Sequence, residues 1–231
     1  MSDIAKKRAA LKALDLVTDG MRLGLGTGTT ARFFLEALGE KARGGLEVCG
    51  LPTSEETAAL ARSLDIPLLD PAETTRLDLA VDGADEVTRR GEMIKGGGGA
   101  MLREKIVAQS AERFVLIADA SKRVATLGRF PLPVEVIPFG LPLTMRQIRE
   151  SLAGIGMSAS TVTLRPAADG VGFAQTDNGN LVVDLALARI DDPEALDTTL
   201  TMIPGVVTTG LFLGLDVHQI LATEDGFLED T

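Results

Sequence analysis

The chain has 231 residues, enough for one large domain or for one domain with a small partner, and its composition is that of a folded globular protein. A net charge of −10, with no Trp and no Tyr, argues against a nucleic-acid partner, because the overall charge repels a polyanion and only eight Phe side chains could stack on bases. A single Cys49 and a single His218 exclude an internal disulfide and a zinc or iron–sulfur site built from such ligands, and they fit a reducing cytoplasm.

Short apolar runs alternate with segments of helical period through the first half of the chain. We expect a helix over residues 4–16, a strand over 22–25, and a helix with Ala31, Phe34, Leu35 and Leu38 on one face. The same alternation predicts strands at 46–50, 77–81 and 114–118, and helices at 54–64 and 99–111. The pattern is typical of an α/β domain with at least four parallel strands.

The second half has a different texture, and four prolines between residues 131 and 142 indicate a domain crossing near Arg129. Beyond it we expect a helix at 142–153, a strand at 158–165, two strands flanking the Asn178-Gly179 turn, and a helix at 193–200. The runs 206–212 and 217–222 are interpreted as strands that return to the first domain. We therefore predict one domain of residues 1–129 and 204–231 and a small α+β domain of residues 130–203.

Neither a signal peptide nor a membrane span is expected. The N-terminal residues carry positive charges, but no long apolar segment follows them. The uncharged run 198–215 is long enough to span a membrane, yet its Thr, Gly and Pro residues indicate turns and strands of a soluble core.

The first candidate ligand segment is Gly26-Thr27-Gly28-Thr29-Thr30, which directly follows a predicted strand. Ligands of open parallel sheets bind at the carboxyl ends of the strands, and this segment offers backbone amides, hydroxyls and a helix N-terminus to a phosphate. A nucleotide loop is disfavoured because no Gly-Lys pair follows, and a nicotinamide site lacks its acidic residue at the end of the second strand. A helix cap without a ligand is the alternative.

The second candidate segment, Asp82-Gly83-Ala84-Asp85-Glu86, places up to three carboxylates after the strand at 77–81. Its small residues leave room for a ligand. The alternatives are an ordinary turn whose carboxylates cap backbone amides, and a divalent metal site, although the sequence completes no ligand set.

The third candidate segment is Lys95-Gly96-Gly97-Gly98-Gly99-Ala100, which leads into a predicted helix. Four glycines lose much conformational entropy on ordering, and a ligand that touches the bare backbone would explain them. A flexible loop with a solvated lysine is the alternative.

Glu104 stands in the helix that follows, among small apolar residues at helical spacing: Ala100, Val107, Ala108 and Ala111. Partial burial raises the pKa of a carboxylic acid toward the range that suits a general base. Spacing alone does not separate this interpretation from a solvated, charged helix surface. Lys122, which could neutralise an anion, and Thr53-Ser54 are weaker candidates, and we interpret His218 as structural.

Several segments, in order through most of the chain, resemble ribose-5-phosphate isomerase, type A. They are GLGTGTTA at 24–31, VDGADE at 81–86, KGGGGA at 95–100 with REKI at 103–106, IADASK at 117–122, FPLPVEVIP at 130–138, TDNGN at 176–180, and IPGVV at 203–207 with GLF at 210–212. Thr29 departs from the Ser that is common in the family but keeps the hydroxyl, and Thr208-Thr209 lies in a variable stretch.

The resemblance implies a Rossmann-like domain and a smaller ferredoxin-like α+β domain. It also implies interconversion of D-ribose 5-phosphate and D-ribulose 5-phosphate through an enediolate, without cofactor or metal, in the pentose phosphate pathway. The expected enzyme is a cytoplasmic homodimer or tetramer.

On that chemistry we assign the proton shuttle to Glu104, oxyanion stabilisation to Lys95, and hydroxyl protons and ring opening to Asp82. Asp85 would orient Lys95 or a sugar hydroxyl. The substrate contacts implied by the resemblance are Thr27, Gly28, Thr29, Thr30, Asp82, Gly83, Ala84, Asp85, Lys95, Gly96, Gly97, Gly98 and Lys122. The hydroxyl-bearing segment and Lys122 are the candidates for the phosphate.

Two other functions compete with the isomerase. A non-catalytic sugar-phosphate sensor would bind ligand without turnover, but we see no helix-turn-helix segment, and a sensor has no need of Glu104 in an apolar stripe. A nicotinamide-dependent oxidoreductase would require saturable cofactor binding.

Overall fold

The computed structural model describes residues 2–157 and 160–228, which form two compact units. The first unit contains the residues up to Ala84, Arg103–Arg123 and the residues from Gly214 onward, and the second contains Asp85–Leu102 and Val124–Leu213. The chain leaves the first unit after Ala84 and re-enters it at Arg103. Two of the candidate ligand segments, residues 82–86 and 95–100, therefore lie at or near these two crossing points in the sequence.

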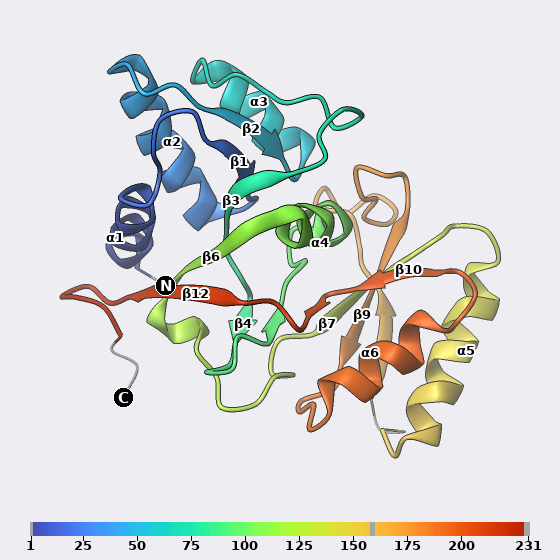
Figure 1. Cartoon of the computed structure of the whole chain (residues 1–231). Coiled ribbons are helices and arrows are strands. Elements are labelled where there is room, and N and C mark those ends of the chain that lie inside the picture. The colour runs from blue at the N-terminus through green and yellow to red at the C-terminus, as the bar shows by residue number, and fades with distance from the viewer. Residues whose placement is uncertain (1, 158–159, 229–231) are drawn as a thin grey trace. The chain divides into compact units, whose positions relative to one another are not determined.

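A five-stranded parallel sheet, in the order β12-β6-β3-β1-β2, forms the centre of the first unit (Figure 1). Its strands are β1 (Arg22–Leu25), β2 (Cys49–Pro52), β3 (Leu77–Asp82), β6 (Ala111–Asp119) and β12 (Val217–Ala222). Leu25 pairs with Val81, and Asp82 pairs with Leu116, so β1, β3 and β6 end at the same edge. The segments that follow these three strands therefore leave the sheet side by side.

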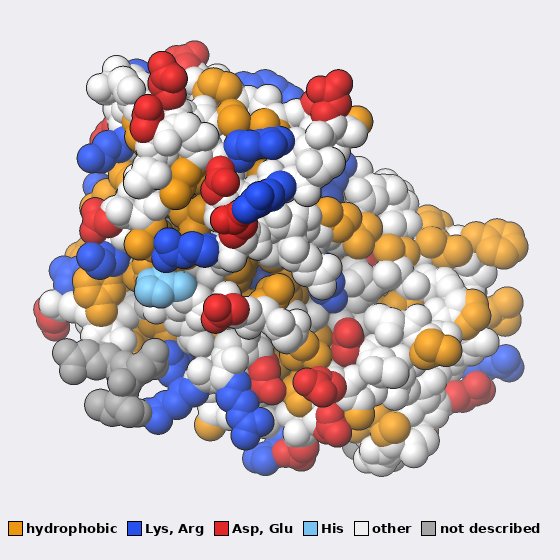
Figure 2. All heavy atoms as spheres, in the orientation of Figure 1, with side chains coloured by type: hydrophobic (Ala, Val, Ile, Leu, Met, Phe, Trp, Pro, Cys, Tyr) orange, Lys and Arg blue, Asp and Glu red, His pale blue; other side chains and the backbone are white. Residues whose placement is uncertain are grey.

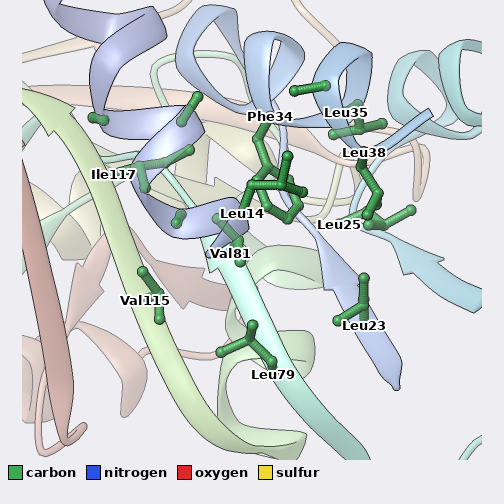
Figure 3. Close-up of a cluster of buried hydrophobic side chains, with 14 of the residues drawn as sticks. Leu14, Leu23, Leu25, Phe34, Leu35, Leu38, Leu79, Val81, Val115 and Ile117 are labelled. Carbon is green, nitrogen blue, oxygen red and sulfur yellow. The ribbon is translucent and has the colours of Figure 1, made fainter. Parts of the chain in front are cut away.

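Helices α1 (Asp3–Leu14) and α2 (Thr29–Arg43) pack on this sheet, and a hydrophobic core lies between them and the strands. Figure 3 shows the helix side chains pointing toward alternate residues of β1, β3 and β6, as the two-residue period of a strand requires. The core members drawn there include Leu14, Phe34, Leu35, Leu38, Leu23, Leu25, Leu79, Val81, Val115 and Ile117. Burial of each large apolar side chain contributes roughly 1.5–3 kcal/mol, so this layer fixes the sheet that carries the candidate segments.

The second unit is built on an antiparallel sheet with the order β10-β7-β9-β8. In chain order its elements are β7 (Leu132–Val136), α5 (Leu141–Gly154), β8 (Thr161–Leu164), β9 (Leu181–Ala186), α6 (Pro193–Thr201) and β10 (Val206–Thr209). This strand–helix–strand–strand–helix–strand order is ferredoxin-like. A three-stranded sheet joins β4 (Glu86–Val87), β5 (Met93–Ile94) and β11 (Leu211–Phe212). The expected fold class, a parallel α/β unit with a smaller α+β unit, is confirmed.

Most elements predicted for the first unit are present, with their ends displaced by a few residues. The strand at 22–25 is β1, and the helix predicted at 54–64 is α3 (Glu55–Ser63), capped by Ser54. The strand predicted at 46–50 begins only at Cys49, because β1 pairs its first residue, Arg22, with Cys49. The helix predicted at 99–111 is α4 (Met101–Ser110), and Ala111 already belongs to β6.

The prediction that residues 206–212 form one strand returning to the first unit is wrong. The run breaks at Gly210 into β10, which pairs with β7, and β11, which pairs with β5, all within the second unit. A Cβ atom at Gly210 would lie 2.3 Å from the carbonyl oxygen of Lys95 and 2.7 Å from Cδ of Pro133. Only glycine fits where the chain crosses between these two sheets. The run 217–222 does join the first unit, as β12.

The hairpin predicted around Asn178-Gly179 is only half formed. Gly179 has the expected positive φ of 77°, and β9 follows the turn. The upstream arm is an isolated bridge between Gln175 and Leu181 rather than a strand. In the strand predicted at 158–165, β8 covers Thr161–Leu164, and Ser158 and Ala159 lie outside the described residues.

The predicted boundaries, 1–129 with 204–231 and 130–203, differ from the two units chiefly in segment 85–102 and in residues 204–213. That the two predicted domains fold independently stays a prediction. In residues 2–157 and 160–228, no helix is both long and apolar enough to cross a membrane. Figure 2 shows acidic and basic side chains interspersed over the visible surface.

Candidate active site

The segment of residues 26–30, here called the hydroxyl loop, joins β1 to α2. Gly28 is the residue before α2 and has a φ of +106°, a conformation that glycine adopts most readily. Thr29 is exposed and begins the helix, so its hydroxyl and the first free amides of α2 face solvent together. This half of the loop has the chemistry of an anion site.

Thr27 has a different position from its neighbours in the hydroxyl loop. Its Oγ1 lies 2.7 Å from Oγ1 of Thr53, 2.8 Å from Oγ of Ser54 and 3.0 Å from Oγ1 of Thr57. Thr57 also donates its hydroxyl to the carbonyl oxygen of Gly26, at 3.0 Å. These hydroxyls, all at the start of α3, fix the hydroxyl loop through hydrogen bonds. Thr53-Ser54 was a weaker candidate from the sequence, and Ser54 is the cap of α3, but nothing in the sequence indicated Thr57.

Asp82 ends β3 and is buried, with 3% of its surface exposed. Its Oδ1 accepts hydrogen bonds from the amides of Thr27, at 3.2 Å, and Gly83, at 2.7 Å. A Cβ atom at Gly26 would lie 2.3 Å from this oxygen, so the close approach of the loop depends on glycine there. Asp82 therefore caps amides, as the turn alternative expected, and it also joins the hydroxyl loop to the second candidate segment.

Glu104 lies on the buried face of α4, with 6% of its surface exposed. Val107 and Ala108, one turn further along, are also buried. A Cβ atom at Gly24 of β1 would lie 2.4 Å from Cγ1 of Val107, which shows how closely α4 packs on the sheet. The structure thus places Glu104 on an apolar face with Val107 and Ala108 rather than on a solvated helix surface, although Ala100 precedes that helix and Ala111 follows it.

Arg103, the charged residue that directly precedes Glu104, pairs with a residue of α3. Its guanidinium donates to Oε1 of Glu55 at 2.8 Å, and this hydrogen bond, together with the positive charge, holds the pKa of the Glu55 carboxyl below its usual value. The pair connects the start of α4 to the start of α3, whose first turn also carries the hydroxyl cluster around Thr57.

Lys122 ends a short 3-10 helix, η1 (Ala120–Lys122), that directly follows β6. Asp119 caps this turn by accepting the amide of Ser121 at 3.0 Å. Because β6 ends at the same edge as β1 and β3, Lys122 leaves the sheet at the edge that carries the hydroxyl loop and Asp82. The arrangement places a lysine at the edge of the sheet from which the hydroxyl loop also leaves.

In the second unit, residues 95–99, here called the glycine loop, follow β5. Lys95 is buried, with 2% of its surface exposed, and its Nζ lies 5.5 Å from the ring centroid of Phe212, within the range of a cation–π contact. Asp85 accepts the amide of Gly97 through Oδ2, at 2.8 Å. The loop is thus ordered by specific bonds, and Asp85 contacts its backbone.

The structure divides the candidate residues between the two units. In the first are Thr27, Gly28, Thr29, Thr30, Asp82, Gly83, Ala84, Glu104 and Lys122. In the second are Asp85, Lys95, Gly96, Gly97 and Gly98. The parallel sheet and α4 carry the first group, and the segments that flank β4 and β5 carry the second. Among the described residues, no group of three or more His, Cys, Asp or Glu side chains is arranged to hold a metal ion.

Comparison with known proteins gives one consistent result. A family profile described as ribose 5-phosphate isomerase A (phosphoriboisomerase A) matches residues 49–226. The ribose-5-phosphate isomerase A of Parvibaculum lavamentivorans is 51% identical over 225 residues, covering 97% of this chain and 96% of that protein. The structure of ribose 5-phosphate isomerase A from Methanocaldococcus jannaschii superposes with a TM-score of 0.88 at 40% identity, over 97% of this chain and 96% of that one. A D-ribose-5-phosphate isomerase solved in complex with phospho-erythronic acid gives 0.89 at 37% identity, over the same shares.

Proposed function

The chain belongs to the ribose 5-phosphate isomerase A family and interconverts D-ribose 5-phosphate and D-ribulose 5-phosphate, and from that premise we propose that Glu104 is its catalytic base. The reaction moves a carbonyl group from C1 to C2 of the sugar. A base removes the proton from C2, electrons shift toward O1 to give an enediolate, and the same acid returns the proton to C1. One hydroxyl proton passes from O2 to O1, so atoms and charge balance.

The burial of Glu104 is the observation that carries this assignment. The residue is 6% exposed on a helix face otherwise made of apolar side chains, a setting that suits a group exchanging protons with carbon. Three further residues have narrower roles in our proposal. Lys95 stabilises the oxyanion of the enediolate, Asp82 transfers hydroxyl protons and opens the sugar ring, and Asp85 orients the loop that carries Lys95.

The phosphate of the substrate would occupy the hydroxyl loop. The N-terminus of α2, where Thr29 is exposed and Thr30 half-buried, and the ammonium of Lys122 support this placement. Thr27 would position this loop for the substrate, because its hydroxyl is engaged by the cluster at the start of α3 and its amide by Asp82. The backbones of Gly28, Gly83, Ala84, Gly96, Gly97 and Gly98 would line the rest of the sugar site.

The assignment is tested by replacing Glu104 with Gln, which keeps the shape and removes the base. We expect turnover of ribose 5-phosphate to fall by about 10² to 10⁴, with an unchanged circular dichroism spectrum. The control is Glu36→Gln, at a half-buried glutamate of α2 that pairs with Arg32 four residues earlier, at 2.9 Å. Near-wild-type turnover of Glu104→Gln would sink the assignment.

We also propose that the enzyme acts in the cytoplasm, in the pentose phosphate pathway, as a homodimer or tetramer without cofactor or metal. The single cysteine supports a reducing compartment. Exposed apolar side chains on the second unit, Phe139, Leu143 and Met202, support self-association. Light scattering measures the oligomer, and assay after chelator treatment tests the metal.

A further inference from the structure

The glycine loop is held by a side chain that the mechanism above does not use, that of Arg165. Its Nη1 donates to the carbonyl oxygen of Gly96 at 2.9 Å and to that of Gly97 at 3.0 Å. Arg165 directly follows β8, and its own amide donates to the carbonyl oxygen of Val182 on β9, at 2.9 Å. The guanidinium therefore reaches the loop from a backbone fixed in the antiparallel sheet.

The other edge of the same guanidinium is anchored on Asp184 of β9. Nε of Arg165 donates to Oδ2 at 2.8 Å, and Nη2 donates to Oδ1 at 2.5 Å. Asp184 pairs with Pro133 of β7 and Thr163 of β8, so it stands within the sheet rather than at its edge. A two-point bond between a planar guanidinium and a carboxylate fixes the orientation of both groups. All four of these hydrogen-bonded contacts lie within the second unit.

The peptide groups of Gly97 are thus held by opposite charges on two sides. Asp85 accepts its amide at 2.8 Å, while Arg165 donates to its carbonyl oxygen. A Cβ atom at Gly97 would lie 2.9 Å from Oδ1 of Asp85, so no other residue lets the carboxylate approach so closely. Ordering a run of glycines costs much conformational entropy, and hydrogen bonds to charged groups are strong enough to offset it.

We propose that Arg165, anchored by Asp184, is a positioning residue for the isomerase reaction. It orders the glycine loop before substrate arrives, so that Lys95 and the loop amides meet the oxyanion without rearrangement. This inference rests on the function proposed above for Lys95 and its loop. Donors that are fixed in advance stabilise the charge that develops in the transition state, so losing Arg165 lowers kcat more than it raises KM.

The variant that isolates this role is Arg165→Lys, which keeps the positive charge and loses the planar fork. A lysine reaches either Asp184 or the loop carbonyls, but not both. We expect kcat to fall by about ten- to a hundredfold, with KM changed by less than about threefold. The matched control is Arg149→Lys, at an exposed arginine of α5 in the same unit whose Nη2 donates only to the carbonyl oxygen of Val162, at 3.4 Å. Its kcat should equal that of the wild type.

Two further readouts separate positioning from a general structural role. Amide hydrogen exchange of residues 95–99 should be faster in Arg165→Lys and unchanged in Arg149→Lys, at equal thermal stability of the bulk protein. In Arg165→Ala, added methylguanidinium should restore part of kcat, whereas ammonium should not. Should Arg165→Lys fail to fold, Asp184→Asn removes the anchor's charge at nearly constant volume and should move kcat and loop exchange in the same direction.

A wild-type kcat in folded Arg165→Lys overturns the proposal, and so does a lower kcat with unchanged exchange in the glycine loop. These results leave the isomerase assignment intact as long as the wild type converts ribose 5-phosphate and Glu104→Gln does not. The exchange measurement needs no turnover. If the wild type itself fails to isomerise the sugar, the proposed function fails whatever the loop does.

Discussion

The hydroxyl loop and the glycine loop both present bare backbone to a ligand, but different chemistry holds each of them. The hydroxyl loop is fastened mainly by neutral hydroxyls at the start of α3, including the bond from Thr57 to the carbonyl oxygen of Gly26, together with one carboxylate, that of Asp82, on the amide of Thr27. The glycine loop has no side chain beyond Lys95 and is fastened from outside by charged groups, Asp85 on an amide and Arg165 on two carbonyl oxygens.

The difference matches the tasks proposed for the two loops. A phosphate carries its full charge before, during and after the reaction, so the loop that binds it acts equally on substrate and transition state. The oxyanion develops only during proton transfer, so the loop beside it must be fixed in advance. We therefore expect defects in the hydroxyl loop to raise KM and defects in the glycine loop to lower kcat.

The change with the largest effect on this comparison is Gly26→Ala. Its Cβ would lie 2.3 Å from Oδ1 of Asp82 and 2.6 Å from the carbonyl oxygen of Val81, so the hydroxyl loop must move away from Asp82. We expect a loss of about 1–3 kcal/mol of unfolding free energy from overpacking, and kcat/KM lower by about a hundredfold or more. Urea unfolding and steady-state kinetics measure both.

The matched stability control for that change lies in the other loop. A Cβ atom at Gly98 would meet no heavy atom within 4 Å, and its φ is not positive, so Gly98→Ala should unfold at the urea concentration of the wild type. Equal destabilisation of the two variants would mean that both loops are simply intolerant of side chains, and the contrast between them would fail.

A smaller effect is expected from Thr57→Val, which keeps the shape of the side chain and removes its hydroxyl. The carbonyl oxygen of Gly26 loses its donor, and Oγ1 of Thr27 loses a partner at 3.0 Å. We predict a loss of about 1–2 kcal/mol of unfolding free energy and a several-fold higher KM with kcat nearly retained. The control is Thr199→Val, at a half-buried threonine of α6 whose hydroxyl donates to the carbonyl oxygen of Ala195 in the same helix. A fall in kcat without a change in KM would contradict the assignment of phosphate to this loop.

The smallest effect is expected from the Arg103–Glu55 pair, which links α4 to α3, the helix whose first turn fixes the hydroxyl loop. Because Arg103 lowers the pKa of Glu55, the folded protein binds this proton less readily than the unfolded chain. The pair's contribution to stability is therefore present above the ordinary pKa of a glutamate and is lost as the pH falls through the lowered value. Both side chains are reached by solvent, so the contribution is small and weakens with salt.

Glu55→Gln removes that titration. Thermal unfolding should show the variant slightly less stable than the wild type at pH 7, with the difference closing as the pH is lowered through the acid range. A constant difference at every pH would show that Glu55 acts through packing and not through its charge.

Local patterns in the sequence were sufficient to predict the candidate segments and the strands that precede them. A buried parallel strand needs continuous apolar residues. The apolar run before Gly26 therefore predicts one strand, and the acidic residues after Val81 indicate where another ends. Which residues meet across the sheet depends on the register of the strands, and local sequence patterns do not determine that register. The strand expected at 46–50 begins late for this reason, since pairing with β1 starts at Cys49.

Residues that act through long-range contacts escaped prediction altogether. Arg165 stands 68 residues from Gly97 in the chain, and Thr57 stands 31 residues from Gly26. Neither belongs to a motif with its partner, and each becomes visible only when the sheets are assembled. Gly210 escaped because its neighbours, Lys95 and Pro133, come from other strands, so an apolar run that reads as one strand is divided into two.

The claim that one carboxylate carries the proton between adjacent carbons is tested most directly in deuterium oxide. Proton NMR can follow the loss of the C1 signal of ribulose 5-phosphate as the enzyme exchanges that hydrogen with solvent. The account predicts exchange with the wild type and with Arg165→Lys, more slowly in the latter, and none above the uncatalysed rate with Glu104→Gln, even where a phosphorylated sugar acid still binds. Exchange by Glu104→Gln at the wild-type rate would contradict it.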